Sequence, residues 1–163
     1  MGNYDFSRIC VLVCDDSPYI RMLLRSFLKG FGVGRIIETI DAREGFMEFI
    51  HEDPDIIISD WNMGETSGID LVNLVRWSEK SPNSFVPIIM LSGYTEIERI
   101  RQARDAGISG YLAKPLTADG LYRQLRAAAD DRRSFIRDDD FFGPDRRSRL
   151  RDEYEGTERR QVA

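Results

Sequence analysis

Residues 9–18 read ICVLVCDDSP, and this stretch decides the fold, because a run of apolar residues leads into two aspartates and then into Ser-Pro. β-branched and other apolar residues favour a buried β-strand at its start. Ser17 is a preferred residue for capping a helix, and Pro18 suits the first helical turn. A strand that ends in acidic residues and passes straight into a helix is typical of a βα unit, whose ligands bind at the carboxyl end of the strand.

The same alternation continues to about residue 133. Hydrophobic spacing predicts strands at 8–14, 35–40, 55–59, 87–91 and 108–113, and helices at 17–29, 42–51, 69–77, 96–106 and 117–133. A loop is expected at 64–68. The strands are almost continuously apolar, which indicates burial on both faces. This order predicts an α/β fold with a doubly wound parallel sheet.

Polar residues follow two further strands at the point where each strand ends. Asp60 follows the apolar residues 56–58, and Lys114 follows the strand at 108–113. Because parallel strands end at one edge of the sheet, Asp15, Asp16, Asp60 and Lys114 are expected to meet there. Carboxylates suit a divalent cation, and a lysine can neutralise phosphate oxygens. Taken singly, the aspartates also fit helix caps or turns.

Composition limits the other possibilities. The chain has 163 residues, a net charge of −5, 42% hydrophobic residues and 31% charged residues, which fits one globular domain with a short extension. The sequence has neither an apolar run long enough for a membrane span nor a secretory signal pattern, so a cytoplasmic protein is expected. Cys10 and Cys14 share one predicted strand, too far apart to bridge, and are expected to be buried thiols. A single histidine argues against zinc, Cys/His and Ser/His/Asp sites.

Four segments in order resemble the receiver domains of two-component response regulators, the CheY-like family of bacterial signalling proteins. They are VCDDS at 13–17, ISDWNM at 58–63, MLSG at 90–93 and YLAKP at 111–115. The resemblance covers about residues 7–133. It implies a (βα)5 flavodoxin/CheY-like fold with strand order 2-1-3-4-5, and it predicts a receiver domain at 1–133 followed by a charged tail at 134–163.

The resemblance also implies roles for residues at the strand ends. Asp60 is the expected phosphoacceptor, and Lys114 is expected to pair with the acyl-phosphate oxygens. Ser92 is expected to offer its hydroxyl to the phosphoryl group, with Tyr111 following the movement of Ser92 as part of the switch. Ser92 stands where threonine is commoner, which predicts a looser switch.

One Mg²⁺ is the cofactor that the resemblance implies. Its expected ligands are Asp15, Asp16 and Asp60, together with the backbone carbonyl of Asn62. Neutralisation of charge is needed because an anionic carboxylate must approach an anionic phosphate. A phosphatase of the haloacid dehalogenase type would need a second aspartate at position 62, where this chain has Asn62.

The implied function is that of a stand-alone response regulator rather than an enzyme, with only Mg²⁺-dependent self-phosphorylation and slow loss of phosphate. A sensor histidine kinase or a histidine phosphotransfer protein is the expected donor. A target protein is expected on the face formed by the fourth helix, fifth strand and fifth helix. The alternative is a scaffold that works without phosphorylation, although such a protein would be expected to have lost an acidic residue or Lys114.

The tail carries an internal repeat. FFGPDRR at 141–147 and YEGTERR at 154–160 both read aromatic-x-Gly-x-acid-Arg-Arg. This order predicts a docking element, and the candidate contact residues are Phe141, Phe142, Arg146, Arg147, Tyr154, Arg159 and Arg160. The tail is too short for a winged-helix or helix-turn-helix domain, so DNA binding is not expected.

Three interpretations of the tail remain open. The aromatic residues could dock on a partner, on a second copy or on the domain's own helices. Alternatively, the arginine pairs could bind a phosphate-bearing ligand such as a cyclic dinucleotide or RNA, because guanidinium groups bind phosphates bidentately. The neighbouring acidic residues weaken that reading. The third interpretation is a disordered tail, which its high charge and few aliphatic residues would also fit.

Overall fold

A computed structural model describes residues 4–93, 97–130, 135–137 and 141–144. Its central feature is a five-stranded parallel sheet in the order β2-β1-β3-β6-β7. The strands are β1 (Cys10–Cys14), β2 (Arg35–Thr39), β3 (Ile56–Asp60), β6 (Ile88–Ser92) and β7 (Gly110–Ala113). Counted among these parallel strands alone, the order is 2-1-3-4-5, so the predicted fold class is confirmed.

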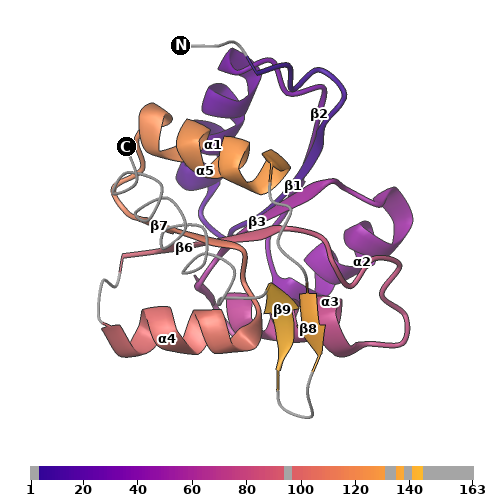
Figure 1. The fold of residues 1–163 in the computed structure, drawn as a ribbon. Helices are drawn as coiled ribbons and strands as arrows, with labels where there is room; N and C mark the ends of the chain where they lie inside the picture. Colours follow the sequence, from indigo (N-terminus) through magenta and orange to yellow (C-terminus); the bar gives the residue numbers. More distant parts are fainter. Residues whose placement is uncertain (1–3, 94–96, 131–134, 138–140, 145–163) are drawn as a thin grey trace, which may run out of the picture.

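Helices cover both faces of the sheet (Figure 1). They are α1 (Pro18–Gly30), α2 (Ala42–Glu52), α3 (Gly68–Trp77), α4 (Ile97–Ala106) and α5 (Ala118–Asp130). The helices α1 and α5 lie on one face, and α2, α3 and α4 lie on the other. Among the described residues, none of these helices is long and apolar enough to cross a membrane.

Two hydrophobic cores explain why the strands are apolar throughout. In β1, Val11 and Val13 pack with residues of α1 and α5, whereas Leu12 and Cys14 pack with residues of α2 and α3. Successive side chains of a strand point to opposite faces, so both sets are buried. Cys14 and Cys10 are both free thiols, but Cys10 is only half-buried because it begins β1 and belongs to neither core, which corrects the expectation of two buried cysteines.

Polar caps start the helices that follow the first three strands. Ser17 accepts a hydrogen bond from the backbone N–H of Ile20 at the start of α1. Asp41 caps α2 in the same way, and Ser67 and Asp70 form a reciprocal capping box at the start of α3. These caps determine the residue at which each helix begins, and therefore the position of the acidic residues between the strand and the helix.

The segment after Asp60 differs from the prediction of a loop. Two short strands, β4 (Asn62–Met63) and β5 (Thr66–Ser67), pair antiparallel there. Gly64 has φ of +70°. A glycine adopts this left-handed conformation without steric cost, so the chain can reverse tightly and the flanking residues can pair.

A second hairpin lies in the tail, where the sequence predicted no strands. It consists of β8 (Phe135–Arg137) and β9 (Phe142–Pro144), which pair antiparallel. Figure 1 shows this hairpin beside α3 and α4, on the face of the sheet away from α1 and α5. Of the predicted tail contacts, Arg146, Arg147, Tyr154, Arg159 and Arg160 lie outside the described residues.

Candidate phosphorylation site

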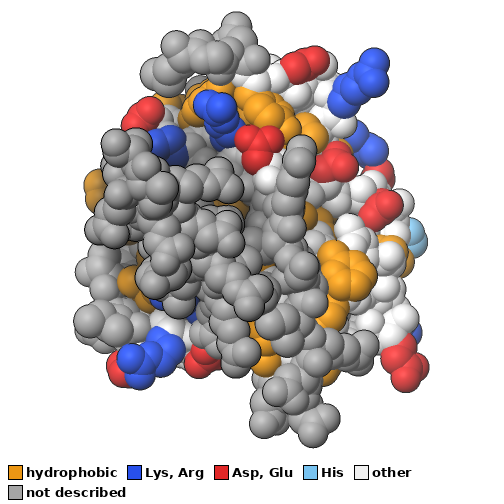
Figure 2. All heavy atoms as spheres, in the orientation of Figure 1, with side chains coloured by type: hydrophobic (Ala, Val, Ile, Leu, Met, Phe, Trp, Pro, Cys, Tyr) orange, Lys and Arg blue, Asp and Glu red, His pale blue; other side chains and the backbone are white. Residues whose placement is uncertain are grey.

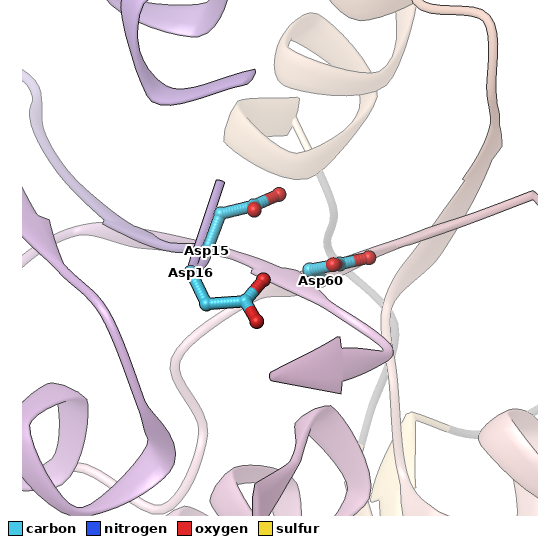
Figure 3. Close-up of side chains that lie close together, drawn as sticks. All are labelled: Asp15, Asp16 and Asp60. Atoms are coloured by element: carbon cyan, nitrogen blue, oxygen red, sulfur yellow. The ribbon is translucent and has the colours of Figure 1, made fainter. Parts of the chain in front are cut away.

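The carboxyl ends of β1 and β3 bring three aspartates together. Cys14 pairs with Ser59 across these neighbouring strands, so Asp15 and Asp60 each follow a paired position. Oxygens of Asp15, Asp16 and Asp60 all lie within 4.8 Å of one another. Figure 3 shows the carboxylates of Asp15 and Asp16 extending from the end of β1 to the side on which Asp60 lies. The expected acidic cluster is therefore present.

Lys114 completes the cluster from the end of β7. Its Nζ donates a hydrogen bond to Oδ1 of Asp60 at 3.0 Å and lies 4.0 Å from Oδ2 of Asp15. Its backbone N–H donates to the carbonyl of Ser92 at 2.9 Å, which holds Lys114 beside the end of β6. The peptide bond between Lys114 and Pro115 is cis.

Burial makes the acidic cluster electrostatically costly. The side chain of Asp15 is completely buried, and that burial raises its pKa to about 6, with the charge of Asp60 adding to the effect. Burial also raises the pKa of Asp60, while the hydrogen bond from Lys114 opposes the rise. Oδ2 of Asp15 is buried and accepts no hydrogen bond from any described residue. The site therefore holds more negative charge than its own protein groups neutralise.

The donor set fits a hard divalent cation. Three carboxylates at this spacing offer the oxygen ligands that Mg²⁺ and Ca²⁺ prefer. The unsatisfied oxygen of Asp15 points to the same conclusion, because buried polar atoms are normally paired. Asn62 begins β4, and its side chain is exposed. Coordination by its backbone carbonyl stays a prediction.

The hydrogen bonds of Asp60 leave one of its oxygens available. The backbone N–H of Trp61 donates to Oδ1 at 2.9 Å, and Lys114 donates to the same oxygen. Oδ2 receives no hydrogen bond from the described residues. The side chain of Asp60 is 10% exposed, so one edge of the carboxylate reaches the surface. The two hydrogen bonds to Oδ1 orient the carboxylate, and Oδ2 is the oxygen that is available to react.

The two residues predicted to form the switch, Ser92 and Tyr111, lie on the neighbouring strands β6 and β7. Asp60 pairs with Leu91 across β3 and β6, so Ser92 follows at the same edge of the sheet. Ser92 is buried, and Tyr111 in β7 is half-buried against the core under α2, α3 and α4. Their movement on phosphorylation stays a prediction.

Two contacts beside the site had no signal in the sequence. The guanidinium of Arg99, in α4, lies 5.4 Å from the ring centroid of Trp61, the residue after Asp60. Arg21 of α1 donates from Nη1 to the backbone carbonyl of Asp15 at 2.8 Å. Both arginines occupy helical positions that read as surface residues, so only the packing of α4 and α1 against the strand ends gives them these partners.

Comparisons with known proteins agree with this geometry. A model of the family described as response regulator receiver domain matches residues 11–126. The chemotaxis protein CheY-3 of Vibrio cholerae is 30% identical over 115 residues, which are 71% of this chain and 87% of that protein. The chemotaxis protein CheY of Pseudomonas aeruginosa is 29% identical over 115 residues, covering 71% and 91% of the two chains.

A solved structure shows the same likeness in three dimensions. The crystal structure of the chemotaxis protein CheY4 of Vibrio cholerae, obtained at low pH, superimposes with a TM-score of 0.68 at 31% sequence identity. The match covers 74% of this chain and 98% of the CheY4 chain. The tail from residue 134 lies beyond the residues that the family model matches.

Proposed function

Because the chain belongs to the response regulator receiver domain family, we propose that it accepts a phosphoryl group on Asp60 and thereby switches a protein-interaction surface. The observation that carries the proposal is the meeting of Asp60 with Lys114 and two further carboxylates at one sheet edge. The donor would be the phosphohistidine of a sensor kinase or of a phosphotransfer protein. A cytoplasmic location belongs to the same proposal and rests on the family resemblance.

Asp60 supplies the nucleophile. Its Oδ2 attacks phosphorus, the bond from phosphorus to the donor's imidazole nitrogen breaks, and an acyl phosphate forms on Asp60. The two hydrogen bonds to Oδ1 hold the carboxylate plane while Oδ2 reacts. Because the carboxyl must be ionised to attack, the hydrogen bond from Lys114, which opposes the rise in the pKa of Asp60, favours the reactive form.

Charge neutralisation is shared between Lys114 and the acidic cluster. Asp15, Asp16 and Asp60 would hold Mg²⁺, with the carbonyl of Asn62 as a further ligand, and the ion would neutralise phosphoryl charge during transfer. In the unmodified protein, Nζ of Lys114 donates a hydrogen bond to Oδ1 of Asp60. After phosphorylation, the same ammonium group would pair with a phosphoryl oxygen bound to Asp60.

The conformational change caused by phosphorylation would be transmitted from Asp60 through the end of β6 and through α4. Ser92 would donate its hydroxyl to a phosphoryl oxygen, and Tyr111 would repack as Ser92 moves. The target would bind the face made by α4, β7 and α5. A phosphorylation-independent scaffold is the rival function, and the experiment below separates the two.

The test is the intact mass of the protein after incubation with Mg²⁺ and acetyl phosphate or a phosphoramidate. Wild type is expected to gain one phosphoryl group that hydroxylamine removes, as it removes acyl phosphates, and Asp60→Asn is expected to gain none. Asp119→Asn alters an exposed carboxylate on α5 and is the matched control, which should react like wild type. No adduct with either donor would favour the scaffold instead.

A further inference from the structure

Phe142, a buried aromatic residue of the tail, lies near the ends of two receiver helices, α3 and α4. Phe142 of β9 is only 5% exposed. Its ring centroid lies 6.0 Å from that of Trp77, the last residue of α3, and 5.5 Å from that of Phe85 in the loop before β6. Such spacing and the tilted ring planes are favourable for aromatic pairs. Phe142 therefore packs against two aromatic rings of the receiver, and the site that these rings form together with Gly107 is called the pocket below.

Two glycines allow the tail backbone to cross the receiver backbone closely. Gly107, directly after α4, has φ of +103°, and a Cβ built there would overlap the carbonyl oxygen of Phe142. A Cβ built on Gly143 would lie 2.7 Å from Cα of Gly107. Both positions therefore have room for hydrogen only, which makes the contact specific for a glycine after Phe142.

A buried arginine fixes the floor of the pocket. Nε of Arg76 donates to the carbonyl of Gly107 at 3.0 Å, and Nη1 donates to the carbonyls of Ser84 and Val86, each at 2.8 Å. These bonds tie α3, the loop before β6 and the turn after α4 into one unit. The pocket is consequently held in shape by receiver residues that lie within the family match.

The pocket is remote from the phosphorylation site. The first residue of α3, Gly68, donates its N–H to the carbonyl of Trp61, beside Asp60, whereas Trp77 is the last residue of the same helix. At about 1.5 Å per residue, α3 separates the two ends by about 14 Å. The two sites therefore lie at opposite ends of α3.

We propose that the pocket formed by Trp77, Phe85 and Gly107 is an intramolecular docking site for the tail segment Phe142–Pro144. The two tail repeats then have different roles. The first repeat anchors the tail because it places phenylalanine and proline on either side of its glycine. The second repeat has Glu155 and Thr157 at those positions, and the pocket does not accept a carboxylate in place of the Phe142 ring.

Among the described residues, the contacts that hold β9 include aromatic rings and closely approaching backbone atoms. On the face seen in Figure 2, acidic and basic side chains of the described residues are interspersed along the top and bottom rather than gathered in one field. Docking should accordingly persist at high salt, unlike an association through the arginine pairs.

The test uses the full-length protein labelled with 5-fluorotryptophan, since the sequence has two tryptophans, Trp61 and Trp77. Phe142→Ala and Gly143→Ala are each expected to shift the fluorine resonance of Trp77 and to leave that of Trp61 in place. Hydrogen exchange of the β8 and β9 amides should accelerate by about tenfold or more. The unchanged Trp61 signal also shows that the receiver remains folded.

The second repeat supplies matched controls. Glu155→Ala and Gly156→Ala make the corresponding changes there and are expected to leave the Trp77 resonance and the exchange rates as in wild type. The proposal fails if Phe142→Ala leaves the Trp77 resonance unchanged, or if the two repeats respond alike. It also fails if docking weakens on dilution, since that would mean that the segment binds a second copy. None of these readouts requires phosphorylation, so they stand apart from the test of Asp60.

Discussion

Replacing Asp15 with asparagine is expected to stabilise the protein in the absence of divalent cations. Asp15 is completely buried, and its pKa rises from the ordinary 3.8 to about 6. At neutral pH this shift corresponds to about 3 kcal/mol of unfavourable free energy for the buried carboxylate. Asparagine removes the charge, and its Oδ1 can still accept the 2.8 Å hydrogen bond from the backbone N–H of Ser17.

The sign of the pH dependence follows from the direction of the pKa shift. The folded state binds a proton at Asp15 more tightly than the unfolded chain, so wild-type stability is higher at low pH and falls as the pH rises through about 6. The advantage of Asp15→Asn should be about 3 kcal/mol near pH 7.5, about half of that near pH 5, and less than 1 kcal/mol near pH 4.

Urea denaturation with EDTA and with Mg²⁺ measures the effect. Mg²⁺ at about 100 times its dissociation constant should stabilise wild type by about 2.7 kcal/mol and the variant by much less, so the advantage should largely disappear. Asp16→Asn removes an exposed carboxylate of the same cluster and should change stability in EDTA by about 0.5 kcal/mol or less. If Asp15→Asn is less stable than wild type in EDTA near pH 7.5, the argument from burial is wrong.

Two further substitutions test groups that hold the site and the pocket. Lys114→Met removes the ammonium 3.0 Å from Asp60, so phosphorylation by acetyl phosphate should slow about 10-fold or more, whereas Lys29→Met on the exposed end of α1 should have wild-type rates in the same mass assay. Arg76→Met leaves three carbonyl oxygens without their donor and should lower the free energy of unfolding by about 3 kcal/mol, at about 1 kcal/mol for each. Urea unfolding checks the second prediction against Arg123→Met, an exposed arginine of α5, and equal stabilities would contradict it.

The acidic site could be predicted because its signals are local. The end of each strand is marked in the sequence by a change from apolar to polar residues, as at Cys14 and Asp15. The parallel topology places all such ends at one edge of the sheet. The sequence could not predict which of the three carboxylates is the most deeply buried. Only the packed structure buries Asp15 and leaves Asp16 exposed, and this difference decides which of them carries the electrostatic cost.

The short hairpin after Asp60 shows the limit of propensity. The sequence predicted a loop at 64–68, but the positive φ of Gly64 lets Asn62 pair with Ser67. The pairing depends on Ser67 also capping α3, because the cap fixes where the returning strand must lie. Gly64 favours a turn and Ser67 favours a helix cap, and the position of α3 determines that the residues between them pair as strands.

The sequence by itself determined the alternation of strands and helices and the residues at the strand ends, because these depend on side-chain periodicity and chain order. The resemblance of four ordered motifs to known receiver domains indicated the family. Only the tertiary structure decided that Phe142 enters a receiver pocket and that Arg99 lies over Trp61. Gly107 and Gly143 are 36 positions apart in the sequence and carry no local mark of their contact. Their partnership exists because the packing of α3 and α4 on the sheet creates a site that a distant segment of suitable shape can fill.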